Sequence, residues 1–209
     1  EDGIRDKLVT GVQTCALPIF KELIENYELD GLHLDYIRYH DSEYGQNPGA
    51  IAQYRKENGL KVLQLSTSTP DPMTAAKAGQ WSDSRRKAVT ELVRDTKSLI
   101  DVIRPNLILS AAVKPNLYQA RDRYYQEWDV WLAAGYLDKA VVMNYTKILK
   151  DFAANIDIIY DNLPTKYRKQ IVLDIATYTQ STRLVVANVQ YSRVTRFIGI
   201  SFFSYYFMI

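Results

Sequence analysis

The strongest candidate for chemistry is the segment DGLHLDYIRYH, residues 30–40. Side chains alternate between the two faces of a β-strand, so the leucines share one face while His33 and Asp35 share the other. A carboxylate and an imidazole directed into a fold cost free energy unless they are hydrogen-bonded or functional. Arg38 follows closely and could pair with a carboxylate or hold a substrate hydroxyl group. The alternative is a buried Asp–Arg or Asp–His pair that only ties the strand to its loop.

Five short apolar runs, rich in β-branched or aromatic residues, predict the strands that position these groups. The runs are residues 31–39, 107–113, 140–146, 170–178 and 198–206. Helical patterns lie between them, and alternation of strand and helix predicts parallel βα units. The runs are nearly continuous in apolar character, as expected of strands that are covered on both faces.

The clearest helical pattern is SRRKAVTELVRDTKSLIDVIRP, in which apolar residues recur at intervals of three and four up to Pro105. Weaker helices are predicted at residues 20–26, 124–134, 151–162 and 183–196. Residues 41–80 are rich in Pro, Gly, Ser and Thr, and we expect a long loop there. A loop of this length in a compact domain is usually functional or disordered.

An open doubly wound sheet and a (β/α)8 barrel both fit this α/β pattern. No glycine-rich phosphate loop follows a predicted strand, which argues against dinucleotide binding. Polar residues instead stand at the carboxyl ends of the strands, as in barrel enzymes. They are Asp35, Lys114, Asn144, Tyr145, Tyr178 and Tyr205. Five strands are too few to close a barrel, so the predicted fold is a partial (β/α)8 TIM barrel consisting of the last five of eight strands.

Composition narrows the class of protein. A net charge of +2 gives no indication of a nucleic-acid or membrane-surface partner. The longest apolar run, at the C-terminus, is shorter than the roughly 20 residues that span a bilayer. Cys15 is the single cysteine and His33 and His40 are the two histidines, so we expect no metal site and no cofactor.

Residues 1–19, EDGIRDKLVTGVQTCALPI, resemble the translation of a common indexed sequencing adapter. Such a segment was never selected to fold and is excluded from fold reasoning. The domain is then expected at residues 20–209, with the upstream βα units and any signal peptide lost. Two other interpretations are a signal peptide, which polar residues inside the apolar stretch exclude, and a short strand that ends at Pro18.

Four segments together resemble the glycosyl-hydrolase-like family 10, bacterial (β/α)8 enzymes. They are GLHLDYIRY, WSDSRRKAVTELV, RPNLILSAAVKP and YYQEWDVWLAAGYLDKAVVMNYT. The resemblance implies hydrolysis of O-glycosidic bonds in a carbohydrate polymer, with peptidoglycan glycan strands as a candidate. It also implies a secreted, periplasmic or lipoprotein location. Two positions depart from the family pattern: His40 replaces a proline, and Asp174 stands where glycine is usual.

The family 18 chitinases offer a more distant comparison, with D-G-x-D-x-D-x-E on the equivalent strand. In this chain Asp30 and Asp35 match that pattern, but Ile37 stands where the acidic glutamate belongs. Without that acid the substrate-assisted chitinase mechanism cannot run in the same way. A chitinase is therefore rejected and the barrel architecture is kept.

Glycoside hydrolysis usually needs two carboxyl groups, about 5–5.5 Å apart for retention and about 6.5–9.5 Å apart for inversion. Asp35 is predicted as nucleophile or base and Glu127 as the second carboxyl. Glu127 could instead be a helix N-terminal charge favoured by the dipole. The other sources of the second carboxyl are Asp174, for which a buried structural role is favoured, and the missing strands.

The predicted substrate-binding residues are His33, Arg38, Lys114, Asn144, Tyr145 and Tyr205. The last four have a packing or rim role as their alternative. His33 is expected to orient Asp35 rather than to bind a metal. Trp128 and Trp131 are expected to be core anchors. Two rival functions stay open: a non-catalytic glycan-binding barrel, and a structural fragment without activity.

Overall fold

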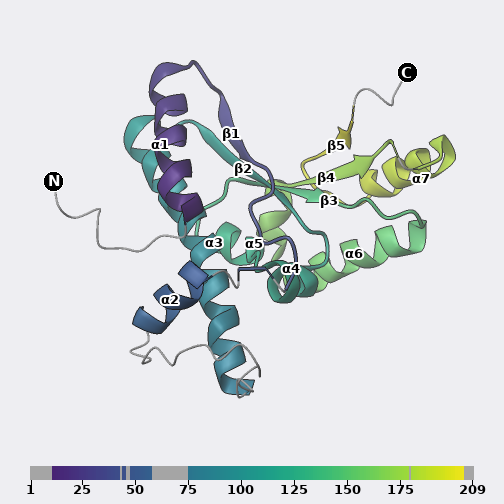
Figure 1. The fold of residues 1–209 in the computed structure, drawn as a ribbon. Coiled ribbons are helices and arrows are strands. Elements are labelled where there is room, and N and C mark those ends of the chain that lie inside the picture. The colour runs from purple at the N-terminus through teal and green to yellow at the C-terminus, as the bar shows by residue number, and fades with distance from the viewer. Residues whose placement is uncertain (1–10, 43, 46–47, 58–74, 179, 205–209) are drawn as a thin grey trace.

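The computed structural model describes residues 11–204 apart from 43, 46–47, 58–74 and 179 (Figure 1). Its strands are β1 (Gly31–Leu34), β2 (Ile108–Val113), β3 (Lys139–Met143), β4 (Ile171–Ala176) and β5 (Gly199–Phe203). Its helices are α1 (Gly11–Asn26), α2 (Pro48–Glu57), α3 (Ala75–Ile103), α4 (Leu117–Tyr124), α5 (Trp128–Ala133), α6 (Leu149–Asn162) and α7 (Thr182–Arg193), with the 3-10 helix η1 at Thr165–Gln170.

The five strands form one parallel sheet in the order β1-β2-β3-β4-β5. Each strand pairs with the next in the chain, and helices make the return crossings (Figure 1). This is the order of consecutive (β/α) units in a barrel, and the sheet does not close on itself. The prediction of a partial (β/α)8 barrel with five parallel strands is confirmed, although each strand is shorter than its apolar run.

The two faces of the sheet differ in what covers them. One face is packed under the helices and carries the fully or nearly fully buried apolar residues of the core, which include Leu109, Val142 and Leu173. The alternate residues of the same strands point to the other face and are more polar. These inward-facing residues include His33, Ser110, Asp174 and Ser201. The sequence alternation thus separates a helix-covered core from the side that is the interior of a barrel.

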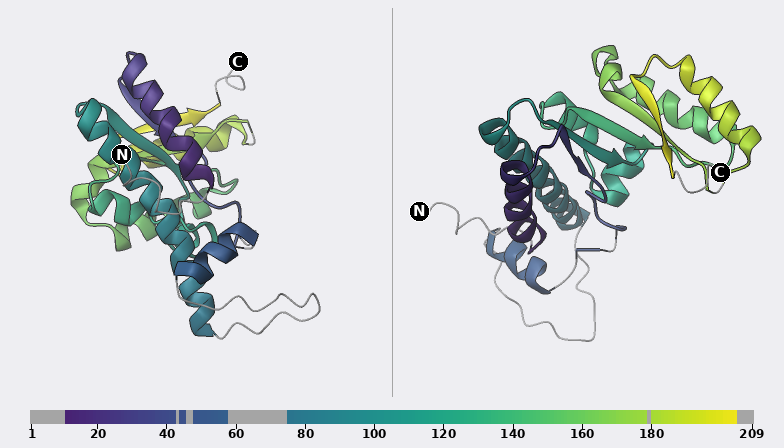
Figure 2. Two further views of the ribbon diagram at one scale, coloured as in Figure 1. Left: turned by 60° about the vertical axis from the view of Figure 1, so that its left-hand side comes forward. Right: turned by 90° about the horizontal axis from the view of Figure 1, so that it is seen from above.

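Helix α1 packs beside the long helix α3 (Figure 2). It begins at Gly11, so it includes the second half of the segment that resembles an adapter. Ala16 and Leu17 are partly buried against the core, whereas Cys15 is exposed. The interpretation of this stretch as a strand ending at Pro18 is wrong, because Pro18 lies inside the helix. The domain boundary at residues 19 and 20 stays a prediction.

Two predicted elements change in the structure. Residues 41–80, expected as one long loop, contain α2 and the first turns of α3. The predicted helix at 124–134 is divided into α4 and α5, because Tyr125 adopts a left-handed conformation with φ of 55° and ends α4. The Tyr125 amide then caps α4 by donating to the carbonyl of Ala120. The break leaves Gln126 and Glu127 between the two helices.

Candidate active site

The carboxyl ends of all five strands lie at one edge of the sheet because the strands are parallel. Asp35 directly follows β1, Lys114 directly follows β2, and Tyr145 stands two residues after β3. Asp35 is exposed, and its carboxylate accepts a hydrogen bond of 2.7 Å from the backbone amide of Tyr36. This edge is where (β/α)8 enzymes assemble their catalytic groups.

Asp174 is the most buried carboxylate of this edge, with 7 % of its surface exposed. It lies on β4 in register with Met143 of β3 and Ser201 of β5. The Ser201 hydroxyl donates to one carboxylate oxygen at 2.7 Å, and the Tyr145 hydroxyl donates to the other. Three neighbouring strands therefore contribute to one hydrogen-bonded group on the inward face.

The pKa of Tyr145 lies well above the ordinary value of 10.0. Burial is the main cause, and the hydrogen bond and charge of Asp174 add to it. Smaller contributions come from Tyr178 and from the charge of Asp35. The phenol therefore stays protonated, and its hydroxyl group donates the hydrogen bond to Asp174. Asp35 directly follows β1 at the same edge of the sheet, and the Tyr145–Asp174 hydrogen bond joins the ends of β3 and β4.

A second cluster lies at the ends of β1 and β2. Arg38 and Lys114 both approach the ring of Tyr124, with distances to the ring centroid of 5.2 Å from the guanidinium carbon and 4.9 Å from Nζ. Arg38 also lies 4.0 Å from the ring centroid of Tyr36. Tyr36 is 51 % exposed and has a φ of 55°. A left-handed backbone at a residue other than glycine is uncommon and is concentrated at functional sites.

Two predicted binding residues take other positions. Asn144 is fully buried, and its amide donates to the carbonyl of Phe152 at 3.0 Å and accepts from Asn155 at 2.9 Å. It ties the end of β3 to α6 and does not join the cluster at the edge. His33 is exposed on the inward face, but its Nδ1 bonds the hydroxyl of Ser110 at 2.9 Å rather than Asp35. Tyr205 lies outside the described residues.

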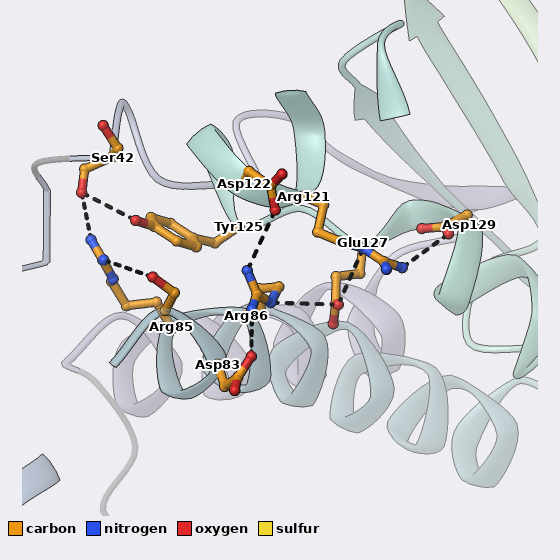
Figure 3. A network of polar contacts seen from close by, with 10 residues as sticks. Ser42, Asp83, Arg85, Arg86, Arg121, Asp122, Tyr125, Glu127 and Asp129 are labelled. Carbon is orange, nitrogen blue, oxygen red and sulfur yellow. Dashed lines mark hydrogen bonds and ion pairs between the residues drawn. The ribbon is translucent and has the colours of Figure 1, made fainter. Parts of the chain in front are cut away.

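Glu127, predicted as the second carboxyl, lies among the helices. Its carboxylate is 3.7 Å from the guanidinium groups of both Arg86 of α3 and Arg121 of α4 (Figure 3). A contact of 3.5 Å joins it to the hydroxyl of Thr90. Glu127 stands at the N-cap position of α5 without a capping hydrogen bond, and a helix N-terminal charge there stays an alternative role. The structure does not bring Glu127 into the group formed by Asp35, Tyr145 and Asp174.

Gln126 fixes the geometry of the first two strand ends. It is 1 % exposed, and its amide nitrogen donates to the carbonyls of Ile37 and Ala112 at 3.2 and 3.1 Å. Its oxygen accepts from the backbone amide of Lys114 at 2.8 Å. The Trp128 indole adds a hydrogen bond of 3.0 Å to the Lys114 carbonyl. The loop after β1 and the residue after β2 are therefore held together by a buried side chain.

Trp128 and Trp131 are both fully buried, which confirms their prediction as core anchors. Among the described residues, no group of three or more His, Cys, Asp or Glu side chains is placed to hold a metal ion. No described helix combines the length and the apolar character that crossing a bilayer requires.

Comparison with known proteins decides the family. The family model described as glycosyl hydrolase-like 10 matches residues 5–193. The chain belongs to this family. A search of curated proteins finds no match. The glycosyl hydrolase-like 10 match covers four of the five strands and every residue of the two clusters except Ser201.

The burial and two hydrogen bonds of Asp174 agree with the buried structural role expected for it, and its position between Leu173 and Ile175 places it on the inward face. Two further residues at this edge of the glycosyl hydrolase-like 10 domain, Tyr36 and Tyr124, are absent from the sequence-based candidates. No sequence pattern marks Tyr36 and Tyr124 as site residues, because their common feature is the contact of both rings with Arg38 in the folded chain.

Proposed function

We propose that this domain takes part in hydrolysis of O-glycosidic bonds in a polysaccharide, with Asp35 as the carboxylate that acts on the substrate. One observation carries the proposal: Asp35 is exposed at the carboxyl end of β1, at the same edge of the sheet as the hydrogen-bonded pair Tyr145 and Asp174. Membership of a glycosyl hydrolase-like family supports the same chemistry.

The exposure of each side chain indicates its role in the proposed reaction. Asp35 can reach a substrate as nucleophile or base, because its side chain is exposed and accepts a hydrogen bond from the Tyr36 amide. The transition state is oxocarbenium-like, so carboxylates beside it stabilise positive charge. Tyr145 is oriented by its hydrogen bond to Asp174 and provides a neutral hydroxyl group at the same edge of the sheet. Arg38 and Lys114 line the neighbouring strand ends.

For the second carboxyl, the geometry favours Asp174 over Glu127. Asp174 lies on the inward face and is hydrogen-bonded to Tyr145 at the edge of the sheet where Asp35 also stands. Glu127 is engaged by two arginines of the helical layer. A carboxylate from strands that complete the barrel is the other source. A non-catalytic glycan-binding barrel is the rival function, and it differs in requiring no second carboxyl at all.

The test compares Asp35→Asn with Asp30→Asn in a protein that carries this sequence within a closed barrel. Asp30 is an exposed aspartate that immediately precedes β1, so the same chemical change is made at the opposite end of one strand. We expect Asp35→Asn to abolish release of reducing ends, by about 10³-fold or more, while Asp30→Asn leaves it within a few-fold. Unchanged turnover in Asp35→Asn would sink the assignment.

Peptidoglycan glycan strands are the substrate we propose within this class, together with a secreted, periplasmic or lipoprotein location. Both rest on the family resemblance of the signature GLHLDYIRY. Comparing hydrolysis of purified glycan strands with hydrolysis of chitin oligomers measures the preference. Equal rates on the two would remove the cell-wall assignment and leave the general glycosidase proposal standing.

A further inference from the structure

Arg38 and Lys114 carry positive charges that have no carboxylate partner in the described part of the chain. Arg38 makes a single hydrogen bond there, a long one of 3.3 Å to the carbonyl of Tyr39. Its Nε atom is buried and has no acceptor among the described residues. A buried donor of a charged group left without a partner costs free energy, and such exceptions in native proteins call for an explanation.

The neighbouring Arg123 shows the contrast. Its guanidinium also lies near the Tyr124 ring, 5.5 Å from the centroid. Arg123, however, is neutralised by Asp41 through two hydrogen bonds of 3.0 and 2.6 Å. Burial, followed by the charges of Arg38 and Arg123, lowers the pKa of Lys114 from its ordinary value. Like charges held together in a half-buried place are stabilised when an anion binds between them.

These two cations lie at the same edge of the sheet as the proposed catalytic carboxylate. Leu34 of β1 is in register with Ala111 of β2, so the ends of the two strands are neighbours. Asp35 directly follows β1 and Lys114 directly follows β2, so both stand at these neighbouring strand ends. The rings of Tyr36 and Tyr124 contact Arg38 and provide flat surfaces of the kind that pack against sugar rings.

We propose that Arg38 and Lys114 form an anion-binding subsite that holds the carboxylate of an acidic sugar unit next to Asp35. This inference rests on the proposed function, because it deepens the substrate class of the same site. The planar guanidinium suits a carboxylate, and the ammonium group supplies a second charge. The ring carboxylate of a uronic acid and the lactyl ether carboxylate of a muramic acid unit present the same chemistry.

The experiment measures binding of two kinds of oligosaccharide to the 209-residue chain by calorimetry. One kind contains uronic acid units and the other contains N-acetylmuramic acid units, and each is compared with its own carboxyl-reduced form. We expect the unmodified chain to bind at least one acidic form about tenfold or more tightly than its reduced form. The oligosaccharide that shows the preference identifies the source of the carboxylate.

Variants assign the preference to the two cations. Arg38→Gln and Lys114→Gln should each lose most of the discrimination between acidic and reduced forms, whereas Lys150→Gln, an equal charge change at the start of α6, should keep it. Lys114→Met serves if a glutamine variant does not fold. Absence of any preference in the unmodified chain, or loss of preference in Lys150→Gln to the same extent, would overturn the subsite.

The outcome is separable from the proposed function. A carboxylate preference that depends on Arg38 and Lys114 would support the subsite even if no glycan is hydrolysed by any form of the protein. Hydrolysis that depends on Asp35 but proceeds equally on acidic and carboxyl-reduced glycans would support the enzyme assignment and contradict the anion-binding subsite.

Discussion

The hydroxyl group of Tyr145, just beyond β3, donates a hydrogen bond to the carboxylate of Asp174 on the adjacent strand β4. The two residues are 29 positions apart in the chain. Their contact joins a protonated phenol to a nearly buried carboxylate at the edge where the exposed Asp35 also stands.

Replacing Tyr145 with phenylalanine should destabilise the domain by about 1.5 kcal/mol, because Asp174 then keeps, among the described residues, only the Ser201 hydroxyl as a side-chain donor. Denaturant unfolding measures the change. Tyr118→Phe is the matched control, since its hydroxyl donates to the neutral Asn162 side chain at an exposed site and should cost less than about 0.5 kcal/mol. Equal effects of the two variants would contradict a special role of the Tyr145–Asp174 bond.

Glu127→Gln should leave glycan hydrolysis nearly unchanged and lower the free energy of unfolding by no more than about 1 kcal/mol. Its ion pairs with Arg86 and Arg121 are long, at 3.7 Å, and pairs of this kind contribute little. Turnover and thermal unfolding measured on the same preparation separate the two effects. A loss of turnover as complete as that of Asp35→Asn would restore Glu127 as the second catalytic carboxyl.

The pairing of Asp41 with Arg123 should keep this carboxylate ionised well below pH 3.8. The Arg123 hydrogen bond is the main cause of the lowered pKa, followed by the backbone amide of Ser42. A lowered pKa in the folded state means that the stabilisation is present above the unfolded pKa and is lost as the pH falls through the folded one. Arg123→Gln should move the pKa of Asp41 back toward 3.8, as read from its carboxyl carbon resonance. An unchanged titration curve would show that the backbone bond alone is responsible.

Leu17→Ala should cost about 1 kcal/mol of stability, because the side chain is partly buried against the core. Cys15→Ser, at an exposed position of the same helix, should cost less than about 0.5 kcal/mol. Chemical unfolding of both variants gives the comparison. No difference between them would mean that residues 11–19 make no stabilising contact, as the resemblance to an adapter implies.

Much of the fold followed from local patterns. Each of the five apolar runs contains a strand. The backbone N–H and C=O groups of a run buried under helices need hydrogen-bond partners, and neighbouring strands provide them. Strand alternation placed Leu32 and Leu34 in the core and His33 on the opposite face, as predicted. The break between α4 and α5 was missed because it depends on one left-handed residue, Tyr125, whose type does not favour that conformation.

The sequence by itself determined the parallel (β/α) order and the placing of Asp35 at a strand end, because period and polarity are written in neighbouring residues. Only the tertiary structure decided which distant groups meet. Asp174 meets Tyr145 and Ser201 through the register of three strands, and Arg38 meets Lys114 through the Tyr124 ring. Asn144 and Glu127 are polar like these residues, but their side chains bind groups of the helices. Residue type does not fix the direction of a side chain, because packing decides which partners lie within reach.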